Sequence, residues 1–373
     1  MRVKLEDVCE KGSSNLKQSD VVNLTGEYPI YGAAGYIGNV DFYHQEKPYV
    51  AIVKDGAGIG RTTLHPAKSS VIGTMQYLLP KDNVLPEYLC YVVRHMHLEK
   101  YFTGATIPHI YFRDYKNEKF NLASLDKQAE IVGILKKAES VIRKRRQQLT
   151  ELDNLIKARF VEMFGDMLLN EMGWQEVHLD ALADVVSGIT KGRKVREAEL
   201  IEVPYMAVSN VKDGYIDWTT VKTIMATKQE IEQYRLLPYD VLMTEGGDPD
   251  KLGRGAVIAA PLENSIHQNH IFRVRLQLEK ILPVFFSQYL QNPKAKLYFL
   301  GCAKQSTGIA SINMKQLRSL PVLVPPIELQ EQFAAFVEQV DKSKVAEATH
   351  TLCTLFNIIL NGGTRYDIRT NEF

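Results

Sequence analysis

Polar side chains that could contact a ligand gather in a turn at residues 267–270. His267-Gln268-Asn269-His270 precedes a strand-like run. Gln and Asn are the side chains that make bidentate contacts with adenine edges. The two histidines are three residues apart, so on a strand they would face opposite sides and could not easily share a metal. A polar turn without a ligand explains this stretch equally well.

Two basic stretches offer contacts to phosphate. The loop Lys191–Arg196 supplies Lys and Arg, and Lys304–Thr307 adds hydrogen-bonding side chains. Ordinary solvated surface is an equal alternative for charge of this kind. A third run, Arg143–Arg146, lies within a helical pattern and is better explained as a solvated face or a partner contact, with a secondary role on a DNA backbone left open.

Two loops resemble catalytic or metal sites but have the wrong spacing. Asp55–Arg61 has G-x-G-x-G rather than G-x-G-x-x-G, and strand and turn residues follow it instead of a helix. We interpret it as a hairpin or bulge that needs positive φ. Glu245–Lys251 holds three carboxylates without calcium-loop spacing, which favours a structured loop. The sequence contains no P-loop, no N-P-P-Y and no G-x-S-x-G motif, so we predict no catalytic residues and no metal site.

The element that must position these loops is Ser124–Asp166. Apolar or long-stemmed residues recur there at steps of four and three, the 3.5-residue repeat of a coiled coil. Gly165 stands where such a helix would end. At 1.5 Å per residue, some 40 residues would form a rod of about 60 Å. A rod of this length needs a partner for its apolar seam.

The partner is predicted by an internal repeat. Segment 174–326 repeats the order of elements in 1–123 at an offset of roughly 200 residues. Val324–Phe333 parallels Leu122–Ile131, so a second long helix should begin near Ile327.

The register of this second helix changes after Val340. The positions that would face Ile142, Arg145 and Leu149 are polar, namely Lys344, Glu347 and Thr351. Apolar residues return one step off, at Val345, Leu352, Leu355 and Ile359. The sequence therefore supports pairing in the first half of this helix more strongly than in its second half.

Composition sets limits on the class of protein. The 373 residues are 45% hydrophobic and 24% charged, the balance of a soluble globular protein. Four well-separated cysteines are typical of reduced cytosolic thiols, and no run resembles a signal peptide or a membrane span. We therefore expect a cytoplasmic protein that does not contact membranes. The net charge is +1, so any basic surface must come from local segregation of charge.

Two globular domains, each followed by a long helix, resemble the specificity subunit of type I restriction–modification systems. The residues that carry the resemblance are Leu125–Val132, Arg143–Leu149, Phe160–Asp166, Pro325–Gln330 and Phe333–Val337. The resemblance implies an α+β fold with two target-recognition domains separated by two long antiparallel helices that form a coiled coil. The expected boundaries are 1–123 for the first domain, 124–169 for the central helix, 170–325 for the second domain and 326–373 for the C-terminal helix.

The resemblance also implies a function and a set of partners. Each domain would read one half of a split target in double-stranded DNA, and two methyltransferase subunits would dock on the helices and methylate adenine. A motor–nuclease subunit would join for cleavage. This chain would hold no cofactor itself, and S-adenosylmethionine, ATP and Mg²⁺ would belong to the partner subunits. The alternatives are a nucleotide-binding enzyme that uses the glycine loop, and a non-catalytic protein-binding scaffold with two end domains on a coiled-coil rod.

The resemblance does not identify the residues that contact bases, so we choose loop residues by side-chain chemistry. The candidates in the first domain are Lys54, Arg61, His109, Tyr111 and Arg113. The candidates in the second domain are Lys191, Arg193, Ser209, Asn210, Lys251, Arg254, Gln268, Asn269 and Gln305.

Overall fold

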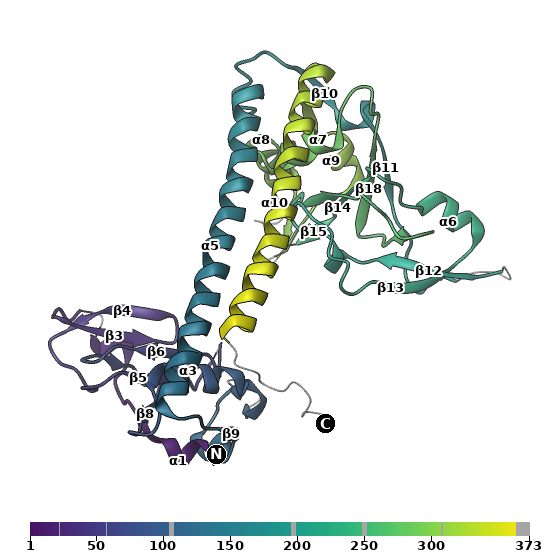
Figure 1. Ribbon diagram of the computed structural model, residues 1–373. Coiled ribbons are helices and arrows are strands. Elements are labelled where there is room, and N and C mark those ends of the chain that lie inside the picture. The colour runs from purple at the N-terminus through teal and green to yellow at the C-terminus, as the bar shows by residue number, and fades with distance from the viewer. Residues whose placement is uncertain are drawn as a thin grey trace. The chain divides into compact units, whose positions relative to one another are not determined.

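The computed structural model combines sheets with two long helices (Figure 1). The residues it describes are 1–21, 23–56, 58–103, 108–194, 199–247, 252–306 and 309–362. The chain divides into two compact units, one formed by 1–145 with the chain end from 350, and the other by 146–349.

A four-stranded antiparallel sheet organises the first unit, with the order β2-β8-β5-β6. Its strands are β2 (Cys9–Ser13), β8 (Met75–Pro80), β5 (Tyr49–Val53) and β6 (Thr62–His65). Every residue of β5 is buried, as a continuous apolar run in a central strand predicts. Helix α3 (Pro86–His95), which begins with proline, shares one core with this sheet.

Smaller elements complete the first unit. One sheet has the order β4-β3-β7, with β3 and β7 parallel, and β1 pairs with β9. The bounds are β1 (Arg2–Lys4), α1 (Leu5–Val8), α2 (Gln18–Val21), β3 (Tyr28–Gly32), β4 (Gly35–Val40), β7 (Ser70–Val71), η1 (Leu98–Tyr101), α4 (Phe112–Tyr115) and β9 (Lys119–Asn121).

The second unit repeats this topology. Its main sheet has the order β11-β18-β14-β16, a second sheet has the order β13-β12-β17 with β12 and β17 parallel, and β10 pairs with β21. The strand bounds are β10 (Gln175–His178), β11 (Ala183–Ser187), β12 (Ile201–Met206), β13 (Lys222–Ala226), β14 (Val241–Thr244), β16 (Gly255–Val257), β17 (Ile266–His267), β18 (Ile271–Leu276) and β21 (Pro321–Val324). The predicted internal repeat is therefore confirmed at the level of strand order.

The second unit also has a third sheet, with the order β15-β20-β19. The remaining bounds are η2 (Leu179–Ala181), η3 (Val208–Asn210), α6 (Lys228–Tyr234), β15 (Gly246–Gly247), α7 (Pro283–Gln291), α8 (Pro293–Cys302), β19 (Lys304–Ser306), β20 (Ile309–Ser311) and α9 (Met314–Arg318).

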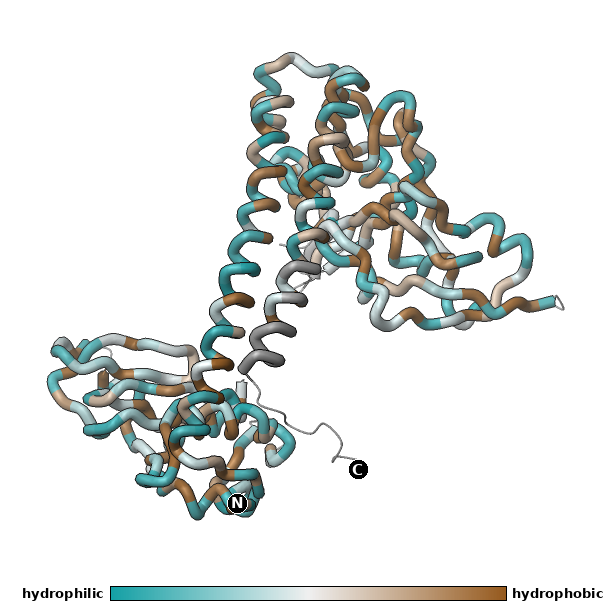
Figure 2. Tube along the Cα trace, in the orientation of Figure 1, coloured by the Kyte–Doolittle hydropathy of each residue, from teal (hydrophilic) through white to brown (hydrophobic). Residues whose placement is uncertain are grey.

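The long helices are α5 (Leu125–Phe164) and α10 (Ile327–Gly362). Gly165 ends α5 with a φ of 74°, as the sequence predicts. In the second unit the helices pack antiparallel, since Phe160 contacts Phe333 with 5.4 Å between ring centroids while Asp153 pairs with Lys344 at 2.8 Å. Hydrophobic positions recur along α5 and along the coloured part of α10 (Figure 2). The predicted α+β class with two antiparallel long helices is confirmed.

Polar contacts replace the apolar seam beyond Val340. Lys344 pairs with Asp153, and Arg145 Nε donates to Thr351 Oγ1 at 2.8 Å. Of the apolar side chains one step off the seam, Val345 and Leu352 are 68% and 69% exposed, and Leu355 is half-buried. The helix nevertheless continues to Gly362, so the loss of apolar register weakens the seam without ending the helix.

A buried glutamine ties the start of each long helix to its domain. Gln128 accepts from the Leu85 N–H at 2.8 Å and donates to the carbonyls of Asn83 and Ala123. Gln330 repeats the arrangement by accepting from the Leu282 N–H at 2.9 Å and donating to the carbonyls of Lys280 and Pro325. Both side chains are fully buried.

Candidate nucleic-acid interface

A groove of about 500 Å³ in the first domain brings several predicted residues together. Lys54, Tyr111 and Arg113 line it. The other charged and polar lining residues are the lysines Lys11 and Lys116 together with Ser13, Asn15, Asp55 and Gln76. We call this concavity the first-domain groove. The groove is formed by residues at the ends of β2 and β5, at the start of β8 and around α4.

Backbone pairing holds the chain before α4 against the end of β5. Asp55 and His109 form an isolated bridge, and His109 Nδ1 lies 2.7 Å from Asp55 Oδ1. Lys54 Nζ is 3.9 Å from the other carboxylate oxygen of Asp55. Since His109 is fixed beside two lining residues, four of the five candidates in the first domain meet at one place.

Tyr111 and Arg113 form an aromatic and cationic edge to the first-domain groove. The Arg113 guanidinium lies over the Tyr111 ring, 4.8 Å from its centroid, and the His109 ring is 6.5 Å from that ring at an interplanar angle of 24°. The Arg113 side chain is 77% exposed. A stacked arginine keeps the planar donors that suit phosphate or guanine recognition.

Arg61, like His109, does not line the groove. The glycine loop connects the antiparallel strands β5 and β6, and Gly56, Gly58 and Gly60 have φ values of 83°, 84° and 81°. This agrees with the predicted hairpin that needs positive φ. The Arg61 side chain is exposed and donates to the Ala33 carbonyl. Ala57 lies outside the described residues.

Two candidates in the second domain are committed to contacts within it. Arg193 forms a bidentate pair with Glu230, at 2.5 and 2.6 Å, and donates to the Met225 carbonyl. Asn210 is 3% exposed. Its amide donates to the carbonyls of Asp217 and Thr220. This geometry argues against both as DNA contacts, because their polar groups hold neighbouring loops in place.

The Arg193–Glu230 pair makes stability depend on pH. Hydrogen bonds from Arg193 lower the pKa of Glu230 to about 2. A carboxyl group whose folded-state pKa is depressed contributes stability above its unfolded value, and this contribution is lost as pH falls through the folded value. We therefore expect the wild type to lose stability relative to Glu230→Gln between about pH 4.5 and pH 2. Denaturant unfolding of both proteins at pH 7 and pH 3 measures this, and parallel losses would contradict it.

The other candidates of the second domain differ in exposure. Lys191 and Ser209 are exposed, whereas Gln268 and Asn269 are half-buried. Gln268 Oε1 accepts from the Val208 N–H at 3.4 Å, which places it beside the Ser209 turn. Lys251 and the side chain of Gln305 lie outside the part that the structure describes.

The two neighbouring histidines diverge, as expected for positions three apart. His267 is fully buried, and burial lowers its pKa to about 3. The His270 side chain is 56% exposed and pairs with Glu245 at 2.5 Å.

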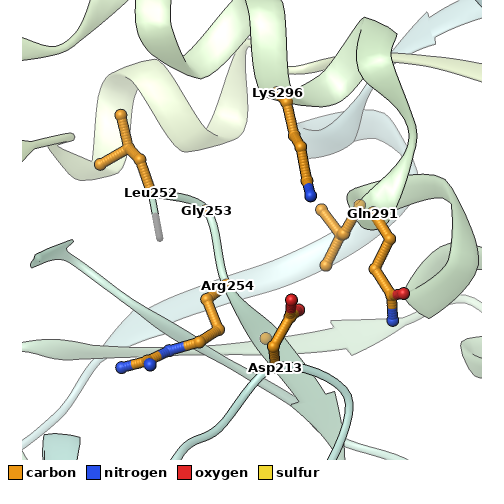
Figure 3. Close-up of a pocket in the computed structure, with 8 residues that line it drawn as sticks. Asp213, Leu252, Gly253, Arg254, Gln291 and Lys296 are labelled. Carbon is orange, nitrogen blue, oxygen red and sulfur yellow. The ribbon is translucent and has the colours of Figure 1, made fainter. Parts of the chain in front are cut away.

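Arg254 borders a small pocket that is shown in Figure 3. Asp213 and Lys296 point toward one another across it, while the Arg254 guanidinium extends away. The pocket volume is about 10 Å³, room for about one water molecule. Arg254 Nε is buried and has no hydrogen-bond partner within the part of the chain that the structure describes. Arg254 thus resembles Arg61 in following a glycine of positive φ, Gly253 at 71°, but it does not line a ligand-sized site.

Gln76 in the first-domain groove is absent from the predicted set. It lies in β8 and is 2% exposed, and its Nε2 has no hydrogen-bond partner among the described residues. The sequence of Met75–Pro80 does not identify Gln76 as a functional residue, since a single polar residue in an apolar strand usually faces solvent. Only the structure shows that the Gln76 side chain is buried.

The fold and the groove define a protein with two repeated α+β domains, each joined to one of a pair of long helices. The sequence matches the family model of the type I restriction modification DNA specificity domain over residues 1–153 and 171–351. The chain belongs to this family, and the predicted resemblance is confirmed.

Individual relatives agree with this assignment. The putative type I restriction enzyme MjaX specificity subunit of Methanocaldococcus jannaschii is 28% identical over 162 residues, which cover 43% of this chain and 38% of that protein. The type I restriction enzyme EcoKI specificity subunit of Escherichia coli is 25% identical over 138 residues, 36% of this chain and 30% of that protein. The chain is thus matched over less than half the length of these relatives.

A solved structure with a similar fold is the S subunit of a type I restriction–modification system from M. genitalium. Its TM-score is 0.55 at 15% sequence identity, and the match covers 97% of this chain and 94% of that one. At this identity the similarity shows the fold alone. Among the described residues, no helix is both long and apolar enough to span a membrane.

Proposed function

We propose that this chain is the DNA-specificity subunit of a type I restriction–modification complex and that each domain binds one half of a bipartite target. The observation that carries the proposal is the match to a DNA specificity domain in both halves of a chain whose strand order is repeated. The proposed partners are double-stranded DNA, two methyltransferase subunits and motor–nuclease subunits, and the proposed location is the cytoplasm.

In this proposal the chain contributes recognition, and catalysis belongs to its partners. Adenine methylation would use S-adenosylmethionine held by the methyltransferase subunits, and cleavage would use ATP and Mg²⁺ in the motor–nuclease subunits. Helix α5 has 40 residues and is therefore about 60 Å long. This length exceeds the roughly 34–36 Å between half-sites that lie one DNA turn apart.

The first-domain groove has the chemistry of a DNA contact surface. Its cations Lys11, Lys54 and Arg113 suit phosphate, which supplies affinity without sequence information. Its polar and aromatic residues suit base edges, where a good bidentate contact discriminates by about 1–3 kcal/mol. The net charge of +1 is compatible with this role because the cations are gathered locally.

Replacing Arg113 by alanine is expected to weaken DNA binding by about 5- to 100-fold, as loss of a specific arginine contact implies. The measurement is DNA affinity of the complex with methyltransferase subunits over a series of salt concentrations. Lys119→Ala is the control, since Lys119 is an exposed residue of β9 outside the groove. Equal affinities for the two variants would contradict a DNA contact at the first-domain groove.

A further inference from the structure

Gln76 lines the first-domain groove with a buried side-chain donor. It stands opposite Ser13 of β2 and Ile52 of β5, so these three side chains share one face of the sheet. Ser13 and Gln76 both line the groove. Gln76 is 2% exposed, and its Nε2 donor is buried without a hydrogen-bond partner among the residues that the structure describes. Such a group is destabilising, and a native protein that retains one needs a reason for it.

The internal repeat shows that the fold does not require a polar residue at this position. Phe272 of β18 stands opposite Ser187 of β11 and Met243 of β14, just as Gln76 stands opposite Ser13 and Ile52. Phe272 is 3% exposed and belongs to the hydrophobic core of the second domain. An apolar side chain is therefore accommodated at the equivalent position of the same topology.

A second buried glutamine in the first domain shows what a structural role demands. Gln128 is fully buried and makes hydrogen bonds to the backbone of Leu85, Asn83 and Ala123. Its amide is fully used in joining α5 to the domain. Among the described residues, the Nε2 of Gln76 makes no such hydrogen bond to the backbone.

A glutamine amide presents one donor and one acceptor side by side, which matches N7 and the N6 amino group of adenine in the major groove. Cations around the groove, Lys11 and Arg113 among them, suit the flanking phosphates. Side-chain rotamer changes are common when proteins bind, and one at Gln76 would turn its amide toward the open side of the groove.

We propose that Gln76 is a specificity-determining residue that contacts an adenine edge in the half-site bound by the first domain. This inference rests on the proposed function and adds a base-reading residue to it. The contact gives the buried Nε2 donor a partner that the described part of the chain does not supply.

The test compares three variants in the complex with methyltransferase subunits, by sequencing methyladenine positions and measuring melting temperature. Gln76→Leu is expected to relax base preference by about tenfold or more at one position of one half-site, with the other half-site unchanged and the melting temperature equal or higher. Gln76→Glu, which only accepts, is expected to shift that preference from adenine toward cytosine. Gln128→Leu is the matched control, expected to lower the melting temperature and leave the motif unchanged.

The inference would be overturned if Gln76→Leu and Gln76→Glu both kept the wild-type motif. A uniform loss of affinity for all sequences would also overturn it, since that result indicates a phosphate contact. A wild-type complex without any bipartite motif is a separate result, which would refute the proposed function itself.

Discussion

Replacing Phe333 by alanine is expected to destabilise the second unit by about 3–5 kcal/mol, the usual loss for a buried phenylalanine. Phe333 is fully buried in α10, and its ring centroid lies 5.4 Å from that of Phe160 and 5.6 Å from that of Phe164. Phe285 of α7 joins the same cluster, 4.9 Å from Phe164. The substitution leaves a cavity between the two long helices and the domain, where the rings of Phe160 and Phe164 lose contacts.

Chemical denaturation followed by far-ultraviolet circular dichroism measures this loss as a lower midpoint at unchanged slope. Val161→Ala is the control, since Val161 lies on α5 beside the cluster but is 52% exposed, and we expect a change within about 0.5 kcal/mol. Equal effects of the two substitutions would contradict the packing of α10 against α5 in this unit.

The second large effect is expected for Gln330→Leu, which should lower the free energy of unfolding by about 2–4 kcal/mol. The reason is that a buried donor and two buried acceptors of the backbone would lose their hydrogen-bond partners. The N–H of Leu282 would lose its acceptor, and the carbonyls of Lys280 and Pro325 would lose a donor. Gln128→Leu should have the same effect in the first unit, since it makes the equivalent contacts.

The control is Gln332→Leu, two residues further along α10 and exposed. Thermal unfolding of the three variants should show a clear loss for Gln330→Leu and Gln128→Leu and almost none for Gln332→Leu. A loss confined to one of the two buried glutamines would contradict the equivalence of the two helix starts.

The long helices and the repeat could be predicted because their signals are local or periodic. The 3.5-residue spacing and Gly165 placed the first helix at Ser124–Asp166, close to the observed Leu125–Phe164. The polar register beyond Val340 also appears in the structure, as the Lys344–Asp153 pair. The roles of Gln128 and Gln330 could not be predicted, because two of the three partners of each lie more than 40 residues away in sequence.

Some of the predicted site residues meet at the groove and others do not, because contacts between residues far apart in sequence decide where each side chain lies. Lys54, His109, Tyr111 and Arg113 were chosen by chemistry alone, and they meet because the Asp55–His109 bridge joins distant loops. Arg193 was chosen on the same grounds but pairs with Glu230, a partner 37 residues away that side-chain chemistry does not reveal. Gln76 was missed because burial of a single polar residue in a strand depends on what covers that strand. DNA contact by all of these residues remains a prediction.

The most direct test of the proposed function is co-expression of this chain with its cognate methyltransferase subunits, followed by sequencing of methyladenine positions across a genome that lacks other adenine methylation. The expected result is a single bipartite motif, with two short specified half-sites and an unspecified spacer of fixed length. A well-formed complex that methylates no motif, or a motif without a spacer, would contradict the assignment of one half-site to each domain.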